Sequence, residues 1–220
     1  MPDYQVKMGF GLHCGWAIEG AIGSFFKIDA SYLSPNVNMA SRLEAATKQY
    51  GAAILISGSL HEILSEEIKY VCREIDTVTV KGSIQPVRLF TVDLDVENMK
   101  AKPDRFLGYP IKDKRSIRDE EKKTIKAKLF GGRMTTWDIY SRDKEFKEMR
   151  KTYDKNFHKK FAEGYKKYIA GDWASAEDIF AQCLKMNAND GPSQTLKGYI
   201  GELNGTPPGD WDGYRELTDK

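Results

Sequence analysis

The chain has 220 residues, 40% of them hydrophobic and 30% charged, values that are typical of a globular protein of one or two domains. Its 34 basic and 32 acidic residues leave a net charge of +2, too small to indicate a nucleic-acid binder from bulk electrostatics. Cys14, Cys72 and Cys183 match no metal-ligand spacing, which favours a reducing compartment over a disulfide scaffold. Because no apolar run has the length of a membrane span and no signal-peptide pattern follows Met1, we expect a cytoplasmic protein, with the cytoplasmic part of a membrane-bound parent protein as the alternative.

Alternating apolar residues predict five strands in the first 95 residues. We expect strands at residues 6–12, 16–22, 53–56, 71–80 and 86–94, and a short helix at 59–64. Gly9, Gly11 and Gly15 leave little side-chain bulk beside the first strand, as is needed where another backbone or a ligand comes close. Gly15, Gly20 and Gly23 lack the spacing of a phosphate-binding loop, so a hairpin is the favoured interpretation.

Two histidines of this region, His13 and His61, carry side chains that can act in catalysis or bind metals. His13 lies in the turn after the first strand, with no Ser, Cys or Asp spaced to work with it, so a structural hydrogen-bonding role is favoured. His61 and Glu62 resemble the first half of a zinc-protease motif, but Ser65 stands where the second histidine is needed. We therefore predict no zinc site.

A helix is predicted between the Ser-Pro-Asn turn at residues 34–36 and Gly51, because the turn can cap a helix start and glycine commonly ends one. Asn38 and Arg42 are four residues apart, so their side chains share one face of this helix. An amide beside a guanidinium near a helix N-terminus suits a phosphate-bearing ligand. A solvated pair on an ordinary amphipathic helix is the alternative.

Four landmarks resemble the catalytic domain of class III nucleotide cyclases, the adenylyl and guanylyl cyclases. The sequence N-V-N-M-A-S-R at 36–42 resembles the segment that carries the family's transition-state Asn and Arg. MGFGLHCGWAIEGAIGS at 8–24 is similar to the family's strand and glycine-rich turn, and ILISGSLHEIL at 54–64 and VTVKGSIQPVRLFTV at 78–92 are similar to its closing strands. The resemblance over residues 6–94 implies an α+β, ferredoxin-like fold, present as the C-terminal part of the cyclase domain.

The resemblance also implies a reaction, the conversion of a nucleoside triphosphate to a 3′,5′-cyclic nucleotide and pyrophosphate. Such phosphoryl transfer needs positioning and charge neutralisation more than covalent help. By resemblance, Asn38 holds the ribose, Arg42 stabilises charge on the α-phosphoryl group, and Lys81 binds the terminal phosphates; a surface lysine is the alternative for Lys81. Ser31 occupies the base-selecting position. Because a hydroxyl both donates and accepts hydrogen bonds, Ser31 does not decide between adenine and guanine. ATP is the favoured substrate over GTP.

The family's metal ligands are not recognisable in this sequence. Class III cyclases bind two Mg²⁺ or Mn²⁺ ions through two aspartates that precede the first strand, and neither Asp3 nor Asp29 has that context. We therefore assign no metal ligand in this chain and expect the ligands outside it. Family active sites form between two catalytic domains, so a second domain is the expected source. We expect the chain either to be the C-terminal piece of a larger cyclase or to be a true short protein that lost catalysis.

The remaining residues divide into three predicted regions. Residues 96–156 are predicted to be a charged linker with one helix around 138–150. Residues 157–205 resemble a tetratricopeptide (TPR) helix hairpin followed by a third helix, a unit that buries too little surface alone and is expected to dock on the cyclase part or on a partner. Residues 206–220 are predicted to form an extended strap packed on the third helix.

Two functions remain open from the sequence. The first is a nucleotide cyclase (a phosphorus–oxygen lyase) of cyclic-nucleotide signalling, working as a homo- or heterodimer of catalytic domains. The second is a non-catalytic scaffold or assembly subunit derived from a cyclase half-domain, with its helical tail docking on a protein partner. Retention of Asn38, Arg42 and Lys81 favours the first, and the missing metal ligands predict that the chain alone is inactive. We expect neither nucleic acid nor a membrane span.

Overall fold

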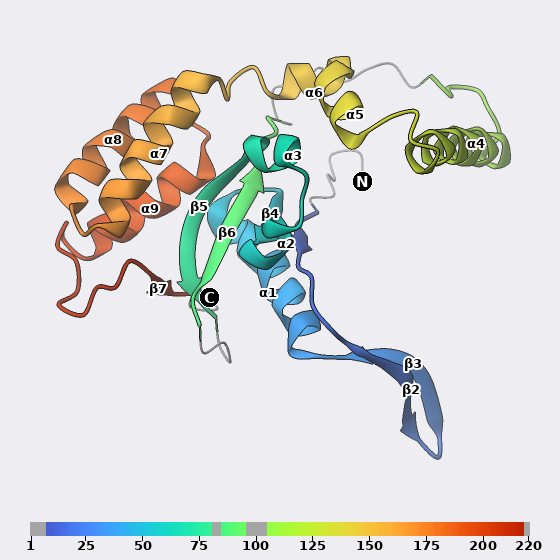
Figure 1. The fold of residues 1–220 in the computed structure, drawn as a ribbon, viewed down its shortest axis with the longest axis horizontal. Coiled ribbons are helices and arrows are strands. Elements are labelled where there is room, and N and C mark those ends of the chain that lie inside the picture. Colours follow the sequence, from blue (N-terminus) through green and yellow to red (C-terminus); the bar gives the residue numbers. More distant parts are fainter. Residues whose placement is uncertain (1–7, 81–84, 96–104, 218–220) are drawn as a thin grey trace. The chain divides into compact units, whose positions relative to one another are not determined.

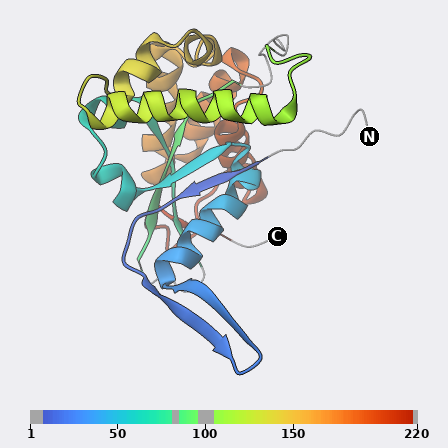
Figure 2. The same ribbon diagram turned by 90° about the vertical axis from the view of Figure 1, so that its right-hand side faces the viewer.

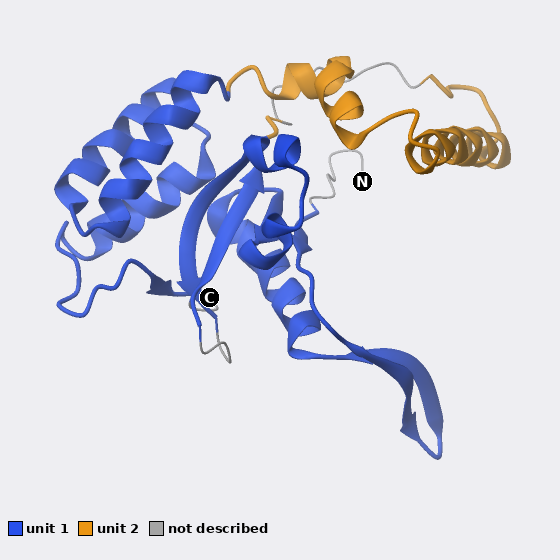
Figure 3. Ribbon diagram, in the orientation of Figure 1, with its two compact units in different colours: residues 1–93, 153–220 blue, residues 94–152 orange. Residues whose placement is uncertain are grey.

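The computed structural model describes residues 8–80, 85–95 and 105–217 (Figure 1). The chain divides into two compact units, which are coloured in Figure 3. Unit 1 contains residues 1–93 and 153–220, and unit 2 contains residues 94–152. Unit 1 carries the sheet and the helix with Asn38 and Arg42. No helix within the described ranges is both long and apolar enough to cross a membrane.

A five-stranded sheet forms the centre of unit 1. Its strands run in the spatial order β1 (Phe10–Leu12), β4 (Ile54–Ser57), β6 (Val87–Val92), β5 (Cys72–Thr79) and β7 (Arg215–Glu216). β1 pairs with β4 in parallel, β6 lies antiparallel to both β4 and β5, and β7 pairs in parallel with β5. Mixed strand directions with separate helices confirm the predicted α+β class.

Helix α1 (Pro35–Tyr50) crosses the sheet against β1. The Ser34 side chain accepts a hydrogen bond from the Asn36 amide at the start, and Gly51 ends the helix in the left-handed conformation with φ of 57°. The contact with β1 depends on small residues: a Cβ atom at Gly11 would lie 2.2 Å from the Ala40 carbonyl oxygen. The predictions of this helix, its two ends and the close backbone approach are all confirmed.

The strands β2 (Ile18–Ser24) and β3 (Lys27–Leu33) form a separate antiparallel hairpin that projects from the sheet (Figures 1 and 2). A hairpin is present in this glycine-containing segment, as expected, but its second strand, β3, is not among the predicted strands. Its residues are largely exposed, with Phe25 and Phe26 at the tip 99% and 94% exposed. An arm with this much apolar surface in solvent is a feature of interaction sites.

The C-terminal helices of unit 1 are α7 (Lys155–Ile169), α8 (Trp173–Met186) and α9 (Gly191–Glu202). They share one continuous core with the sheet and α1, so the expected docking occurs within the chain, on the part with the cyclase motifs. Short helices α2 (Gly58–Glu62) and α3 (Glu66–Val71) connect β4 to β5. The core combines residues from both ends of unit 1: Leu43, Tyr50, Leu55, Ile75, Val78, Leu89, Phe157, Phe161, Tyr168, Trp173, Phe180, Leu196, Ile200 and Leu217.

Two sequence expectations need correction. The strap after α9 was predicted to be extended and packed on the third helix, but its residues Arg215–Glu216 also add β7 to the sheet. In unit 2, one helix was expected around 138–150, whereas α4 (Ile111–Phe130), α5 (Thr136–Arg142) and α6 (Lys144–Met149) are present. α4 was missed because it buries no side chain and so lacks an apolar stripe; its Lys, Arg and Glu residues are good helix formers in water.

Candidate functional site

Asn38 and Arg42 lie in the N-terminal half of α1, one turn apart on one face. The Asn38 side chain is exposed and Arg42 is half-buried. Within the described part of the chain, neither side chain has a hydrogen-bond or ion-pair partner. The first turn of α1 contains no acidic side chain that would neutralise the positive end of the helix dipole. An amide and a guanidinium are therefore free to meet an anionic ligand here.

The other two predicted site residues are Ser31 and Lys81. Ser31 lies on β3, opposite Gly20 of β2, and is half-buried. It stands on the strand that leads directly into α1, but no contact joins it to Asn38 or Arg42 among the described residues. Lys81 lies outside the described residues. The structure therefore brings two of the four predicted residues onto one helix face and leaves the other two as predictions.

A hydrogen-bond network fixes the N-terminal end of α1. The Oδ1 atom of Asn36 lies 3.0 Å from Nε2 of His13, whose Nδ1 lies 2.8 Å from the Ser57 hydroxyl. The side-chain amide of Asn36 (Nδ2) and the Ser34 hydroxyl both donate to the Trp16 carbonyl oxygen, at 2.8 and 2.5 Å. The predicted structural role of His13 is confirmed. Its partners were missed because 23 and 44 residues separate them from His13 in the sequence.

The buried acidic residues that the structure describes in unit 1 are bound to basic side chains. The described residues contain no group of three or more His, Cys, Asp or Glu side chains that could hold an ion. Asp76 is fully buried and accepts from the Tyr50 hydroxyl at 2.6 Å and from Arg215 Nε at 2.9 Å. Burial raises the pKa of the Asp76 carboxyl, while the Arg215 charge opposes that shift. The Asp76 carboxylate is therefore already paired with a cation, the Arg215 guanidinium.

Two other buried carboxylates are also occupied. Asp93 and Asp190 share the guanidinium of Arg73, with Nη2 of Arg73 at 2.7 Å from Asp93 Oδ1 and 2.6 Å from Asp190 Oδ1. Asp29 forms an exposed pair with Lys27 on the hairpin, at 2.9 Å. These described aspartates are therefore all paired with basic side chains.

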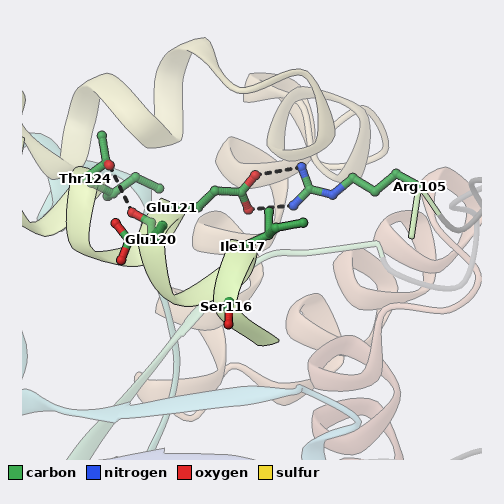
Figure 4. A pocket seen from close by; sticks show the side chains of 7 residues that line it. Arg105, Ser116, Ile117, Glu120, Glu121 and Thr124 are labelled. Carbon is green, nitrogen blue, oxygen red and sulfur yellow. Dashed lines mark hydrogen bonds and ion pairs between the residues drawn. The ribbon is translucent and has the colours of Figure 1, made fainter. Parts of the chain in front are cut away.

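A hollow of about 670 Å³ lies in unit 2 beside α4 (Figure 4). Arg105 and Glu121 face each other across it in a two-bonded ion pair, at 3.0 and 2.6 Å. The Glu121 carboxylate is therefore neutralised, and the Thr124 hydroxyl donates to the Glu120 carbonyl oxygen. The two ionic groups that face each other in this hollow, Arg105 and Glu121, are thus paired with one another.

Comparison with known proteins identifies the same region. Residues 2–93 match the family described as the adenylate and guanylate cyclase catalytic domain. An adenylate cyclase of Anabaena cylindrica is 37% identical over 89 residues, covering 40% of this chain and 18% of the relative. Adenylate cyclase 1 of Rhizobium meliloti is 29% identical over 92 residues, covering 42% of this chain and 13% of the relative. The chain thus spans less than a fifth of the length of these curated relatives.

Two solved structures of a bacterial light-regulated adenylyl cyclase are also similar. The first is 29% identical with a TM-score of 0.31, covering 36% of this chain and 21% of that one. The second is 26% identical with a TM-score of 0.29, covering 35% of this chain and 36% of that one. Because both TM-scores are low, the fold of this chain rests on its own strands and helices.

Proposed function

Residues 2–93 belong to the family of adenylate and guanylate cyclase catalytic domains, and from this premise we propose that the chain contributes one half of a nucleotide cyclase site. The 3′-hydroxyl oxygen of the ribose attacks the α-phosphorus of a nucleoside triphosphate and forms the O3′–P bond of the cyclic phosphodiester. The bond from the α-phosphorus to the α,β-bridging oxygen breaks, pyrophosphate leaves with that oxygen, and the 3′-hydroxyl proton passes to water. ATP is the favoured substrate. The proposal rests on Asn38 and Arg42, which share one face of α1. Neither side chain has a hydrogen-bond or ion-pair partner among the described residues.

Each proposed role follows from the chemistry of its side chain. The Asn38 amide can donate to and accept from ribose oxygens, which orients the sugar for attack. The Arg42 guanidinium presents several donors to the charge that develops on the α-phosphoryl group. Lys81 supplies a point charge for the terminal phosphates, and Ser31 contacts the base. Of these four assignments, those of Asn38 and Arg42 have support from the geometry of α1.

The site needs a second catalytic domain. In this proposal that domain supplies the ligands for Mg²⁺ or Mn²⁺, since the buried carboxylates of unit 1 already bind arginines. The metal would neutralise charge on the triphosphate when bound. The projecting hairpin, with Phe25 and Phe26 exposed at its tip, supports a protein partner. Such a partner is either a second copy or a different cyclase domain.

The purified chain alone is predicted to form no cyclic nucleotide from ATP or GTP with Mg²⁺ or Mn²⁺, because it lacks a recognisable metal set among its described residues. Product formation should appear when the chain is mixed with a class III catalytic domain that retains its metal aspartates but has lost its own Asn and Arg. Product analysis with ATP and GTP then determines the base preference. Turnover by the purified chain alone would refute this division of labour.

A non-catalytic scaffold is the second candidate function. It is favoured by the buried Arg73 and Arg215 ion pairs, which give Asp76, Asp93 and Asp190 a structural role. In that case the TPR-like helices or the hairpin would bind a protein partner. A chain that binds a cyclase domain yet never yields product with it would support this reading over the first.

A further inference from the structure

The C-terminal end of α1 is held by residues far along the chain. The first turn of α9 lies directly on it, since a Cβ atom at Gly191 would be 2.0 Å from the Tyr50 carbonyl oxygen. The Thr195 hydroxyl of α9 donates to the Gln49 carbonyl oxygen at 2.7 Å. This is one of the terminal carbonyls that a helix cannot satisfy internally. The helical region therefore caps the same helix that carries Asn38 and Arg42.

Arg215 provides a second hold on this end of α1. Its Nη2 atom donates to the Tyr50 hydroxyl at 3.1 Å, and its Nε donates to Asp76 at 2.9 Å. The Tyr50 hydroxyl donates to the same Asp76 oxygen at 2.6 Å, and both Tyr50 and Asp76 are fully buried. Arg215 is itself fixed by β7, where it pairs with Val78 of β5. The three side chains join the strap, the sheet and α1 in one buried network.

A change at this end would be transmitted along the helix. Asn38 and Arg42 stand 12 and 8 residues before Tyr50, which is about 18 and 12 Å along the axis of a rigid α-helix. Close contacts at Gly9 and Gly11 hold α1 against β1 without loose packing between them. A small rotation of the helix at Tyr50 is therefore carried to Asn38 and Arg42.

We propose that Arg215 is a positioning residue for the candidate site, which sets the placement of Asn38 and Arg42 through Tyr50 and Asp76. The catalytic consequence rests on the proposed function, whereas the placement of α1 does not. Through this network the C-terminal strap controls the order of the site helix, and release of the strap would loosen it.

Hydrogen–deuterium exchange of the full-length chain tests this placement without nucleotide. Arg215→Ala should speed amide exchange in residues 37–50 by about tenfold or more, because a buried carboxylate loses its cation, while α7 and α8 keep their protection. Arg215→Lys should restore part of the protection, since an ammonium can still reach one partner. Arg88→Ala, which breaks the more exposed pair with Glu74, is the matched control and should leave α1 unchanged.

Unchanged exchange in residues 37–50 of Arg215→Ala would overturn the proposal, as would equal loosening of α1, α7 and α8. If Arg215→Ala does not fold, Tyr50→Phe replaces it as the test, because this variant removes only one hydroxyl from the network. Amide exchange in α1 must then be faster in Tyr50→Phe, while α7 and α8 keep their protection. In the mixed enzyme, Arg215→Ala should lower kcat by about tenfold with little change in KM. Absence of product with the wild-type chain would refute the proposed function alone, because the exchange result needs no nucleotide.

Discussion

Arg73 shows how single charged residues organise the interior of unit 1. Its side chain is only 4% exposed and binds Asp93 and Asp190, while its guanidinium carbon lies 4.2 Å from the centre of the Phe161 ring. The two carboxylates hold the Arg73 charge in place and raise the guanidinium pKa, against the effect of burial. Asp190 also caps α9 by accepting from the Ser193 amide. One residue of β5 therefore fixes the start of the helix that contacts α1.

Arg73→Met is predicted to lower the free energy of unfolding by about 3–5 kcal/mol, because it leaves two carboxylates buried without a cation. Urea unfolding followed by fluorescence measures the change. Arg88→Met is the matched control: it removes an arginine that is 50% exposed and bound to Glu74, and it should cost about 0–1 kcal/mol. Equal costs for the two variants would show that the Arg73 pairs do not stabilise the fold.

At the scale of elements, the packing of α1 on β1 depends on glycine. Gly9 and Gly11 both face the helix, and a Cβ atom at Gly9 would lie 2.2 Å from the Thr47 hydroxyl oxygen. Side-chain atoms at these positions would push the helix away from the strand, and Asn38 and Arg42 would move with it. The glycines therefore set the height of the site helix above the sheet.

Gly11→Ala is predicted to destabilise unit 1 by about 1–3 kcal/mol, since the added methyl group would meet backbone atoms of α1 that cannot step aside. Gly20→Ala on the hairpin is the control, because nothing lies within 4 Å of its Cβ position, and it should change stability by less than about 0.5 kcal/mol. Thermal unfolding of the three proteins gives the comparison. A neutral Gly11→Ala would mean that α1 does not pack as described.

The hairpin makes a separate prediction. Replacing both Phe25 and Phe26 by Ser should weaken association with a second catalytic domain by about tenfold or more, because two exposed aromatic rings are lost from the tip. The melting temperature should hardly change. Sedimentation velocity over a range of concentrations measures the association, with Tyr70→Ser on α3, 73% exposed, as the control. Association that is unaffected by the double substitution would exclude the tip from the interface.

Local signals explain which elements the sequence could predict. The helix at α1 was predictable because its cap, its spacing and its Gly51 stop all lie within eighteen residues, 34–51. The Asn38 and Arg42 pairing on one face followed from helix periodicity alone. By contrast, β7 is two residues long, and its partner strand lies more than 130 residues earlier in the chain. The arginine networks likewise join residues 117 and 139 positions apart, which no local pattern reveals.

At the scale of the whole molecule, unit 1 is built from both ends of the sequence. Side chains from α1 and the sheet share one core with those of α7, α8, α9 and the strap. The division into a cyclase part at residues 1–95 and a TPR-like part at 157–205 remains a prediction about function and ancestry. Physically, α9 and the strap both reach the end of the site helix.

The proposed contribution of this chain to a shared site is its transition-state Asn and Arg. It is tested most directly by mixing the chain with a cyclase domain that keeps its metal aspartates and has alanine at its own Asn and Arg, and measuring cyclic nucleotide formation. The wild-type chain and the Lys48→Ala control should restore turnover, whereas Arg42→Ala should reduce kcat by about 10²-fold or more with little change in KM. Equal turnover with wild-type and Arg42→Ala chains would contradict the account.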